Sequence, residues 1–139
     1  MEDIKLVGVD IDGVSEPRND GMDGRGGSTL YTVPITLSAK PSAEWGRFFV
    51  EAWDHPESFT TQHRPRIATV QGNKVVLSGT TLEEIDRVHK PTLKAAVARA
   101  NENERQRLAQ DAQDKEAKLQ ESYDFRQHVA DMADKITFD

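Results

Sequence analysis

The longest uninterrupted stretch of helix-forming sequence runs from Thr92 to Lys135, about 44 residues without a proline or a glycine. Alanine, glutamine, glutamate, lysine and arginine dominate it, and all of them favour helix. A straight helix of that length would span roughly 66 Å at 1.5 Å per residue, whereas a compact domain of this chain length has a radius of gyration near ~14 Å. The helix must therefore extend beyond such a domain or turn back on it.

Apolar residues are sparse along this stretch until its end. Those at Val97, Leu108, Leu119 and Ala130 recur every 11 positions, which suits a nearly straight or right-handed helical pairing. A heptad repeat fits less well, because it puts Lys115 and Ser122 in the seam. These apolar residues predict a surface that docks on a partner protein, most simply a second copy of the chain. The alternative is that the end of the helix folds back on the sheet of the same chain. The predicted interaction residues are Val97, Leu108, Leu119, Tyr123, Phe125, Val129, Met132 and Ile136.

A shorter helix is predicted just before the long one. Thr81 and Glu84 have the spacing of a capping box, in which the two residues satisfy free N–H groups at a helix start. Pro91 must kink or end that helix and also fits the first turn of the next. We therefore divide the chain into a domain at residues 1–80 and a helical, coiled-coil-like assembly extension at 81–139, with a kink near Pro91.

Strands and turns dominate the first 80 residues. Residues 4–11 have apolar side chains on both faces, which predicts a central, covered strand. Residues 30–38 alternate between apolar and polar, so they predict a half-buried strand, and Pro34 predicts that it lies at an edge or carries a bulge. Residues 66–71 and 74–78 flank Gly72-Asn73, a two-residue turn typical of a hairpin.

One helix is predicted between these pairs of strands. Ser42 can cap it, and the positions of Trp45, Phe48, Phe49, Ala52 and Trp53 form a stripe on one helix face. An aromatic stripe with this spacing is typical of a core. The fold class is therefore α+β, with a small, largely antiparallel β-β-α-β-β sheet domain followed by a long, charged C-terminal helical extension.

Composition excludes several classes of function. The chain has no cysteine, which excludes disulfides, thiolate metal sites and a cysteine nucleophile. A net charge of −6 argues against a general nucleic-acid binder. The acidic start lacks a signal-peptide core, and no apolar run approaches the ~18 residues that span a bilayer. We expect a soluble, cytoplasmic protein without a cofactor.

The stretch Asp10-Ile11-Asp12-Gly13, which follows an apolar strand, resembles the first motif of the haloacid-dehalogenase phosphohydrolases. The resemblance covers about ten residues of the chain. It implies that Asp10 would be the nucleophile and Asp12 the general acid/base of a Mg²⁺-dependent phosphoryl transfer. The family also implies a parallel, helix-connected sheet and a further acidic pair, and this chain contains no Asp-Asp pair. An enzyme is accordingly the alternative prediction and a non-enzymatic protein the main one.

Two further kinds of site are weighed from the residues. Asp10, Asp12, Asp20 and Asp23 lie in or beside a glycine-rich segment and offer the oxygen ligands that a hard cation prefers, but their spacing departs from an EF-hand loop. A solvated acidic loop without a metal is the main prediction there. His55, His63, His89 and His128 show no short ligand spacing, so no histidine metal site is predicted.

Basic residues on either side of residue 80 give a last alternative. Arg64, Arg66, Lys90 and Lys94 would form a small positive patch for nucleic acid, although Glu83, Glu84 and Asp86 adjoin it. The main functional prediction is a non-enzymatic interaction or assembly protein that self-associates, as a homo-oligomer, through its C-terminal helices.

Overall fold

The computed structural model describes residues 2–17, 29–57 and 60–138. It divides into two compact units, Met1–Glu104 and Arg105–Asp139. This boundary differs from the one predicted after residue 80, because the first turns of the long helix belong to the unit that contains the sheet. Leu93, Ala96, Val97 and Ala100 are all buried in its core.

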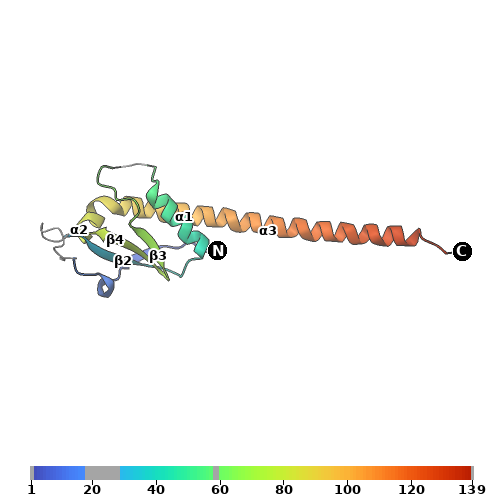
Figure 1. Ribbon diagram of the computed structural model, residues 1–139, viewed down its shortest axis with the longest axis horizontal. Helices are drawn as coiled ribbons and strands as arrows, with labels where there is room; N and C mark the ends of the chain where they lie inside the picture. Colours follow the sequence, from blue (N-terminus) through green and yellow to red (C-terminus); the bar gives the residue numbers. More distant parts are fainter. Residues whose placement is uncertain (1, 18–28, 58–59, 139) are drawn as a thin grey trace, which may run out of the picture. The chain divides into compact units, whose positions relative to one another are not determined.

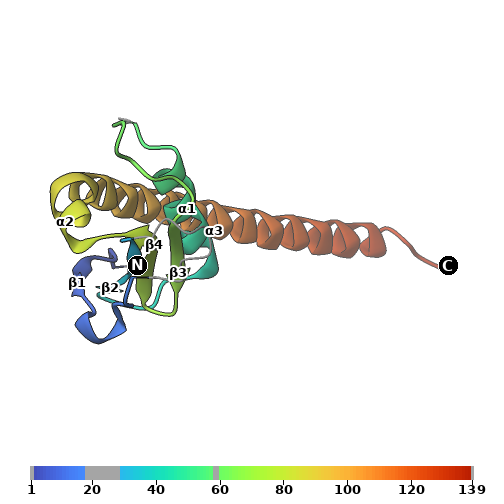
Figure 2. The same ribbon diagram turned by 60° about the vertical axis from the view of Figure 1, so that its left-hand side comes forward.

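The first unit contains a four-stranded sheet with the order β1-β2-β4-β3 (Figures 1 and 2). The strands are β1 (Leu6–Val9), β2 (Tyr31–Leu37), β3 (Ala68–Gln71) and β4 (Lys74–Thr80). All three pairings are antiparallel, and α1 (Ala43–Asp54) separates the two halves of the sheet in sequence. The predicted α+β class and β-β-α-β-β order are confirmed, as is the hairpin at Gly72, whose φ of 61° suits only a glycine without strain.

The prediction of a central, covered first strand is wrong. β1 is an edge strand of four residues, and a register shift between Leu6 and Gly8 marks a bulge in its pairing with β2. Val7 is 67% exposed, while Leu6 packs against the core. A bulge adds one residue to a strand and breaks its alternation. The apolar residues on both faces therefore reflect this irregularity and not two covered faces.

Pro34 lies in an inner strand, not at an edge, and the bulge in β2 falls at Tyr31–Thr32. Its carbonyl accepts the Asp10 N–H at 2.9 Å, but it has no N–H to return to the Asp10 carbonyl. That carbonyl accepts the Gly13 N–H at 3.0 Å instead, which closes the 3-10 turn η1 (Ile11–Gly13). Pro34 thus ends the β1–β2 ladder and leaves the β2–β4 ladder intact.

We expect Gly13→Ala to lower the free energy of unfolding by about 1–2 kcal/mol, because the turn packs on the Pro34 ring. A Cβ at Gly13 would lie 2.6 Å from Pro34 Cγ and 3.0 Å from Asp10 Oδ2. The matched control is Gly8→Ala, since a Cβ there has no neighbour within 4 Å. Urea unfolding of both variants tests this, and equal stabilities would contradict the packing.

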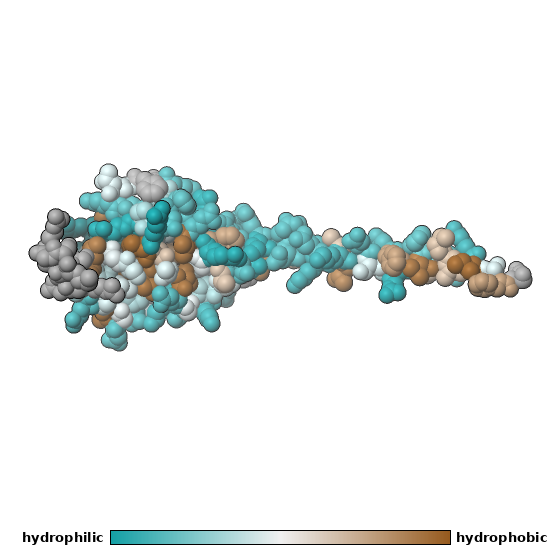
Figure 3. Space-filling model, viewed as in Figure 1, coloured by the Kyte–Doolittle hydropathy of each residue, from teal (hydrophilic) through white to brown (hydrophobic). Residues whose placement is uncertain are grey.

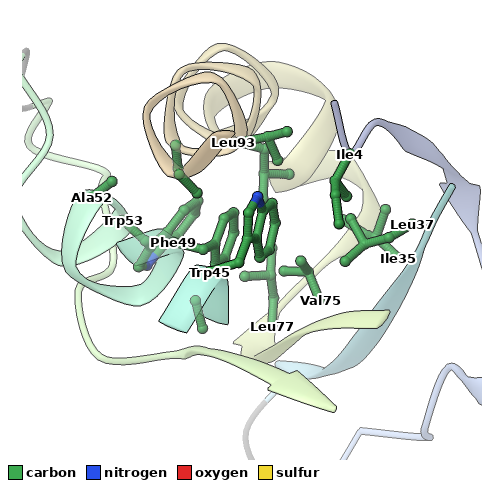
Figure 4. Close-up of a cluster of buried hydrophobic side chains, with 14 of the residues drawn as sticks. Ile4, Ile35, Leu37, Trp45, Phe49, Ala52, Trp53, Val75, Leu77 and Leu93 are labelled. Atoms are coloured by element: carbon green, nitrogen blue, oxygen red, sulfur yellow. The ribbon is translucent and has the colours of Figure 1, made fainter. Parts of the chain in front are cut away.

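The core lies between the sheet, α1 and the start of the long helix (Figure 4). Ser42 caps α1 by accepting the Trp45 N–H at 3.0 Å, as predicted. The predicted stripe is also confirmed: Trp45, Phe49 and Trp53 are essentially fully buried, and Phe48 is partly buried. The rings of Trp45 and Phe49 stack with centroids 5.5 Å apart.

A short helical segment leads into the long helix. It consists of α2 (Leu82–Glu84) and a π-helical turn, η2 (Ile85–His89), and α3 then runs from Lys90 to Asp134. The Lys90 N–H bonds to the Ile85 carbonyl, five residues back. Pro91 lacks an N–H, and its ring crowds the preceding helical turn. A π-helical turn is wider than an α-helical one and relieves this crowding, so the helix is irregular where the sequence predicted a kink. Among the described residues, no helix is long and apolar enough to cross a membrane.

Candidate functional site

The second unit carries a run of exposed apolar side chains. Eight large ones are exposed between Leu108 and Phe138, and Phe138 is 95% exposed. Figure 3 shows brown, hydrophobic surface gathered toward the end of this helix, after a mostly hydrophilic stretch. The eight residues are Leu108, Leu119, Tyr123, Phe125, Val129, Met132, Ile136 and Phe138.

These side chains occupy two sides of α3. At about 100° per residue, Phe125, Val129 and Met132 lie within one arc of about 60°. Leu119 and Tyr123 lie on a neighbouring arc and, with Ala112, line a shallow surface hollow. The helix contains no break before Asp134, so both arcs belong to one continuous element.

Val97 differs from the other predicted interaction residues. It is 6% exposed and packs in the core of the first unit with Leu93 and Ala100. The 11-residue repeat therefore joins a core position to surface positions, and Val97 is not available to a partner. The other seven predicted residues are exposed: Leu108, Leu119, Tyr123, Phe125, Val129, Met132 and Ile136.

The two acidic residues of the phosphohydrolase-like motif lie in an antiparallel setting. The Asp10 carboxylate accepts a hydrogen bond from Lys74 Nζ, which crosses from β4, and this bond lowers the pKa of Asp10. Asp12 lies in the exposed 3-10 turn. β1 has an antiparallel neighbour, whereas the resemblance implied a parallel sheet. The local motif is thus present without the sheet architecture that the family implies.

The predicted cation ligands fall partly outside the described residues. Asp20 and Asp23 lie there, so the four aspartates are not placed together. Across residues 2–17, 29–57 and 60–138, no group of three or more His, Asp or Glu side chains is arranged to hold a metal ion.

A partly buried polar cluster that the sequence did not indicate lies in the first unit, around Glu84. The Glu84 carboxylate accepts bonds from Arg64 Nε and Nη2, Thr80 Oγ1 at 3.1 Å and His89 Nε2 at 2.8 Å. His89 is fully buried. Burial opposes ionisation of Glu84, but these donors outweigh it and lower its pKa from 4.5 to about 2. Glu84 also raises the pKa of Arg64.

Trp53 and His63 extend the cluster toward α1. Trp53 Nε1 donates to the Arg64 carbonyl at 2.9 Å, and His63 Nε2 lies 2.8 Å from the Trp53 carbonyl oxygen. Burial lowers the pKa of His63, so its neutral form is favoured. Arg66 has a φ of 70°, and its N–H bonds to Asp54. A positive φ at an arginine and a π-helical turn both occur often at functional sites. Here most of the polar groups bond to one another, whereas His89 Nδ1 is buried without a hydrogen-bond partner among the described residues.

The four basic residues predicted to bind nucleic acid differ in their surroundings. Arg64 is paired with Glu84, and Lys90 with Asp86 at 3.2 Å. Arg66 and Lys94 are exposed. Two of the four positive charges are therefore already partnered by carboxylates, which weakens the potential that phosphates would meet.

The chain matches no protein-family model, no curated protein and no solved structure. Its functional interpretation therefore rests on its own residues.

Proposed function

We propose that this chain is a non-enzymatic interaction protein that self-associates through the apolar segment Leu108–Phe138. The observation that carries the proposal is the exposure of eight large apolar side chains in one short part of the chain. Exposed apolar patches of this kind mark interaction surfaces in soluble proteins. A second copy is the simplest partner because every chain then supplies the same surface.

The first unit supports this proposal by being complete without the segment. The last residue of α3 in its core is Ala100, and every large apolar side chain of α3 from Leu108 onward is exposed. Apolar residues placed there have no role in the core of that unit. Burial against another chain would recover about 1.5–3 kcal/mol for each large side chain that is fully covered.

We expect Phe125→Glu to weaken self-association on the order of tenfold to a hundredfold, because it puts a charge into an apolar contact. Sedimentation velocity of the full chain at several concentrations measures the effect. Gln113→Glu is the control, since it adds the same charge at an exposed position about 240° around the helix from Phe125, away from both apolar arcs. A wild-type chain that is monomeric at tens of micromolar would overturn the proposal, as would equal effects of the two variants.

A further inference from the structure

Among the residues that the structure describes, no further strand pairs with the edge of the sheet opposite β1. β3 ends the strand order, and the two-residue turn between Gln71 and Lys74 makes these two a hydrogen-bonded pair. Bonding alternates along an antiparallel pair, and the Ser78 N–H accordingly reaches the Ile67 carbonyl at 2.9 Å. The N–H and C=O groups of Ala68 and Val70 therefore point away from β4.

Nothing in β3 protects this edge. Protected edges carry charges, prolines or bulges, and β1 has a bulge and ends at a 3-10 turn. β3 consists of Ala-Thr-Val-Gln in regular register with β4. Of the two edge strands of the described sheet, β3 is therefore the one with regular pairing and no charged side chain. The backbone N–H and C=O groups of Ala68 and Val70 can form hydrogen bonds with a further strand.

A groove of about 770 Å³ runs along this edge, between β3 and α1. Figures 1 and 2 both show α1 alongside β3. α1 and β3 approach within side-chain contact here, since a Cβ at Gly46 would lie 3.5 Å from Val70 Cβ, an ordinary van der Waals distance. Apolar side chains of both elements form its walls: Ala43, Val50, Ala68 and Val70.

The end of the chain has the pattern of a strand that fits such a groove. α3 ends at Asp134, and Ile136, Thr137 and Phe138 follow outside any helix. These three residue types favour strands. In an extended segment Ile136 and Phe138 would share one face, and both are largely exposed.

Charged side chains in the groove indicate whether an added strand would run parallel or antiparallel to β3. Two basic and two acidic residues line the groove: Lys40, Arg47, Glu51 and Asp54. Glu51 and Asp54 lie toward the C-terminal end of α1. Asp54 accepts the Arg66 N–H at 2.8 Å, which places the acidic end at the start of β3. Lys135 precedes the apolar pair, so a strand parallel to β3 brings Lys135 to the acidic end of the groove.

Pairing with a second C-terminal helix would cover Phe125, Val129 and Met132, but it would leave residues 135–138 uncovered, because α3 ends at Asp134. A seam through Phe125, Val129 and Met132 meets Ser122 and Lys115 on the preceding turns, and it therefore extends over only about two heptads, short of the three to four typical of a coiled coil.

We propose that residues 135–138 of one copy add as a parallel strand to the β3 edge of a second copy, with Ile136 and Phe138 against α1. This inference rests on the proposed self-association and names the acceptor surface for residues 135–138. Strand addition beside a flanking helix gives main-chain hydrogen bonds for affinity and side-chain pockets for specificity. The interface joins two different surfaces, so each copy keeps one free donor and one free acceptor, and chains can grow.

A mixing experiment with two full-length variants tests the inference. Val70→Pro removes an N–H that points away from β4, so it should block the acceptor while leaving the hairpin paired. Phe138→Asp should block the donor. Each variant alone should lose at least about tenfold in association, since an unmade buried hydrogen bond or apolar contact costs that much. A 1:1 mixture should form a heterodimer by sedimentation, because one intact donor meets one intact acceptor.

A second pair of variants, in which the charges of Glu51 and Lys135 are exchanged, tests the inference if Val70→Pro fails to fold. Glu51 and Lys135 are both exposed, so Glu51→Lys and Lys135→Glu should leave the fold unchanged. Each should weaken association a few-fold, as expected for a surface ion pair, and the double variant should restore it. Assembly that persists in Val70→Pro, a mixture that stays monomeric, or no rescue by the exchange would overturn this inference and leave the proposed self-association standing. A monomeric wild-type chain would overturn both.

Discussion

Replacing Asn101 with alanine should lower the free energy of unfolding by about 3–5 kcal/mol, because it leaves three buried polar groups without partners. Asn101 Oδ1 accepts the Ile4 N–H at 3.0 Å and the Trp45 indole N–H at 2.9 Å. Its Nδ2 donates to the Ile4 carbonyl at 2.9 Å. One amide thus connects the N-terminal segment, α1 and α3, and water cannot readily replace it, since Asn101 is only 5% exposed.

Urea unfolding followed by tryptophan fluorescence measures this loss, because both tryptophans lie in α1. Asn103→Ala is the matched control: it makes the same change two residues later, where the side chain is only partly buried. Its stability should stay within about 0.5 kcal/mol of the wild type. A loss below about 1 kcal/mol in Asn101→Ala would show that these bonds do not hold the three elements together.

Asn101 also shows why the domain boundary was not predictable. On the sequence, the residues around it form a polar, helix-favouring stretch with few apolar groups. In the fold, small residues of α3 pack on the aromatic stripe of α1, and an asparagine binds a backbone segment 97 residues earlier. Local composition indicates a helix, but it does not indicate which turns of that helix lie on the sheet.

The sheet was more predictable than the placement of its strands. Alternation predicted β2, and the Gly72-Asn73 turn predicted the hairpin, because both signals are local. The position of β1 at an edge depends on pairing with a strand that lies more than 20 residues later. Pro34 misled for a related reason: its missing N–H faces only the β1 side, where the ladder ends anyway.

The gathering of large apolar residues in the last turns of the long helix was visible in the sequence, because it depends only on local composition. The Glu84 cluster was not. Thr81 and Glu84 predicted a capping box, and Thr81 does accept the Glu84 N–H at 3.0 Å. The Glu84 carboxylate, however, binds Arg64 and His89. Arg64 lies 20 residues before Glu84 in the sequence and comes close to it only through the tertiary fold.

Glu84→Gln should lower the free energy of unfolding at pH 7 by about 2 kcal/mol, since it removes the charge that Arg64 and His89 bind. The pKa of Glu84 is about 2 in the folded chain against an ordinary value of 4.5. Its folded pKa is therefore depressed, and the ionised form stabilises the fold above about pH 4.5. This stabilisation is lost as the pH falls from 4.5 toward 2.

The difference between wild type and Glu84→Gln should consequently shrink over the same pH range and nearly vanish near pH 2, as chemical unfolding at a series of pH values would show. Glu83→Gln is the control, because Glu83 is the exposed neighbour, and its effect should stay within about 0.5 kcal/mol throughout. A difference that stays constant from pH 7 to pH 3 would mean that the glutamine acts through packing. In that case the charge on Glu84 would not be what holds the loop at Arg64 to the helix at His89.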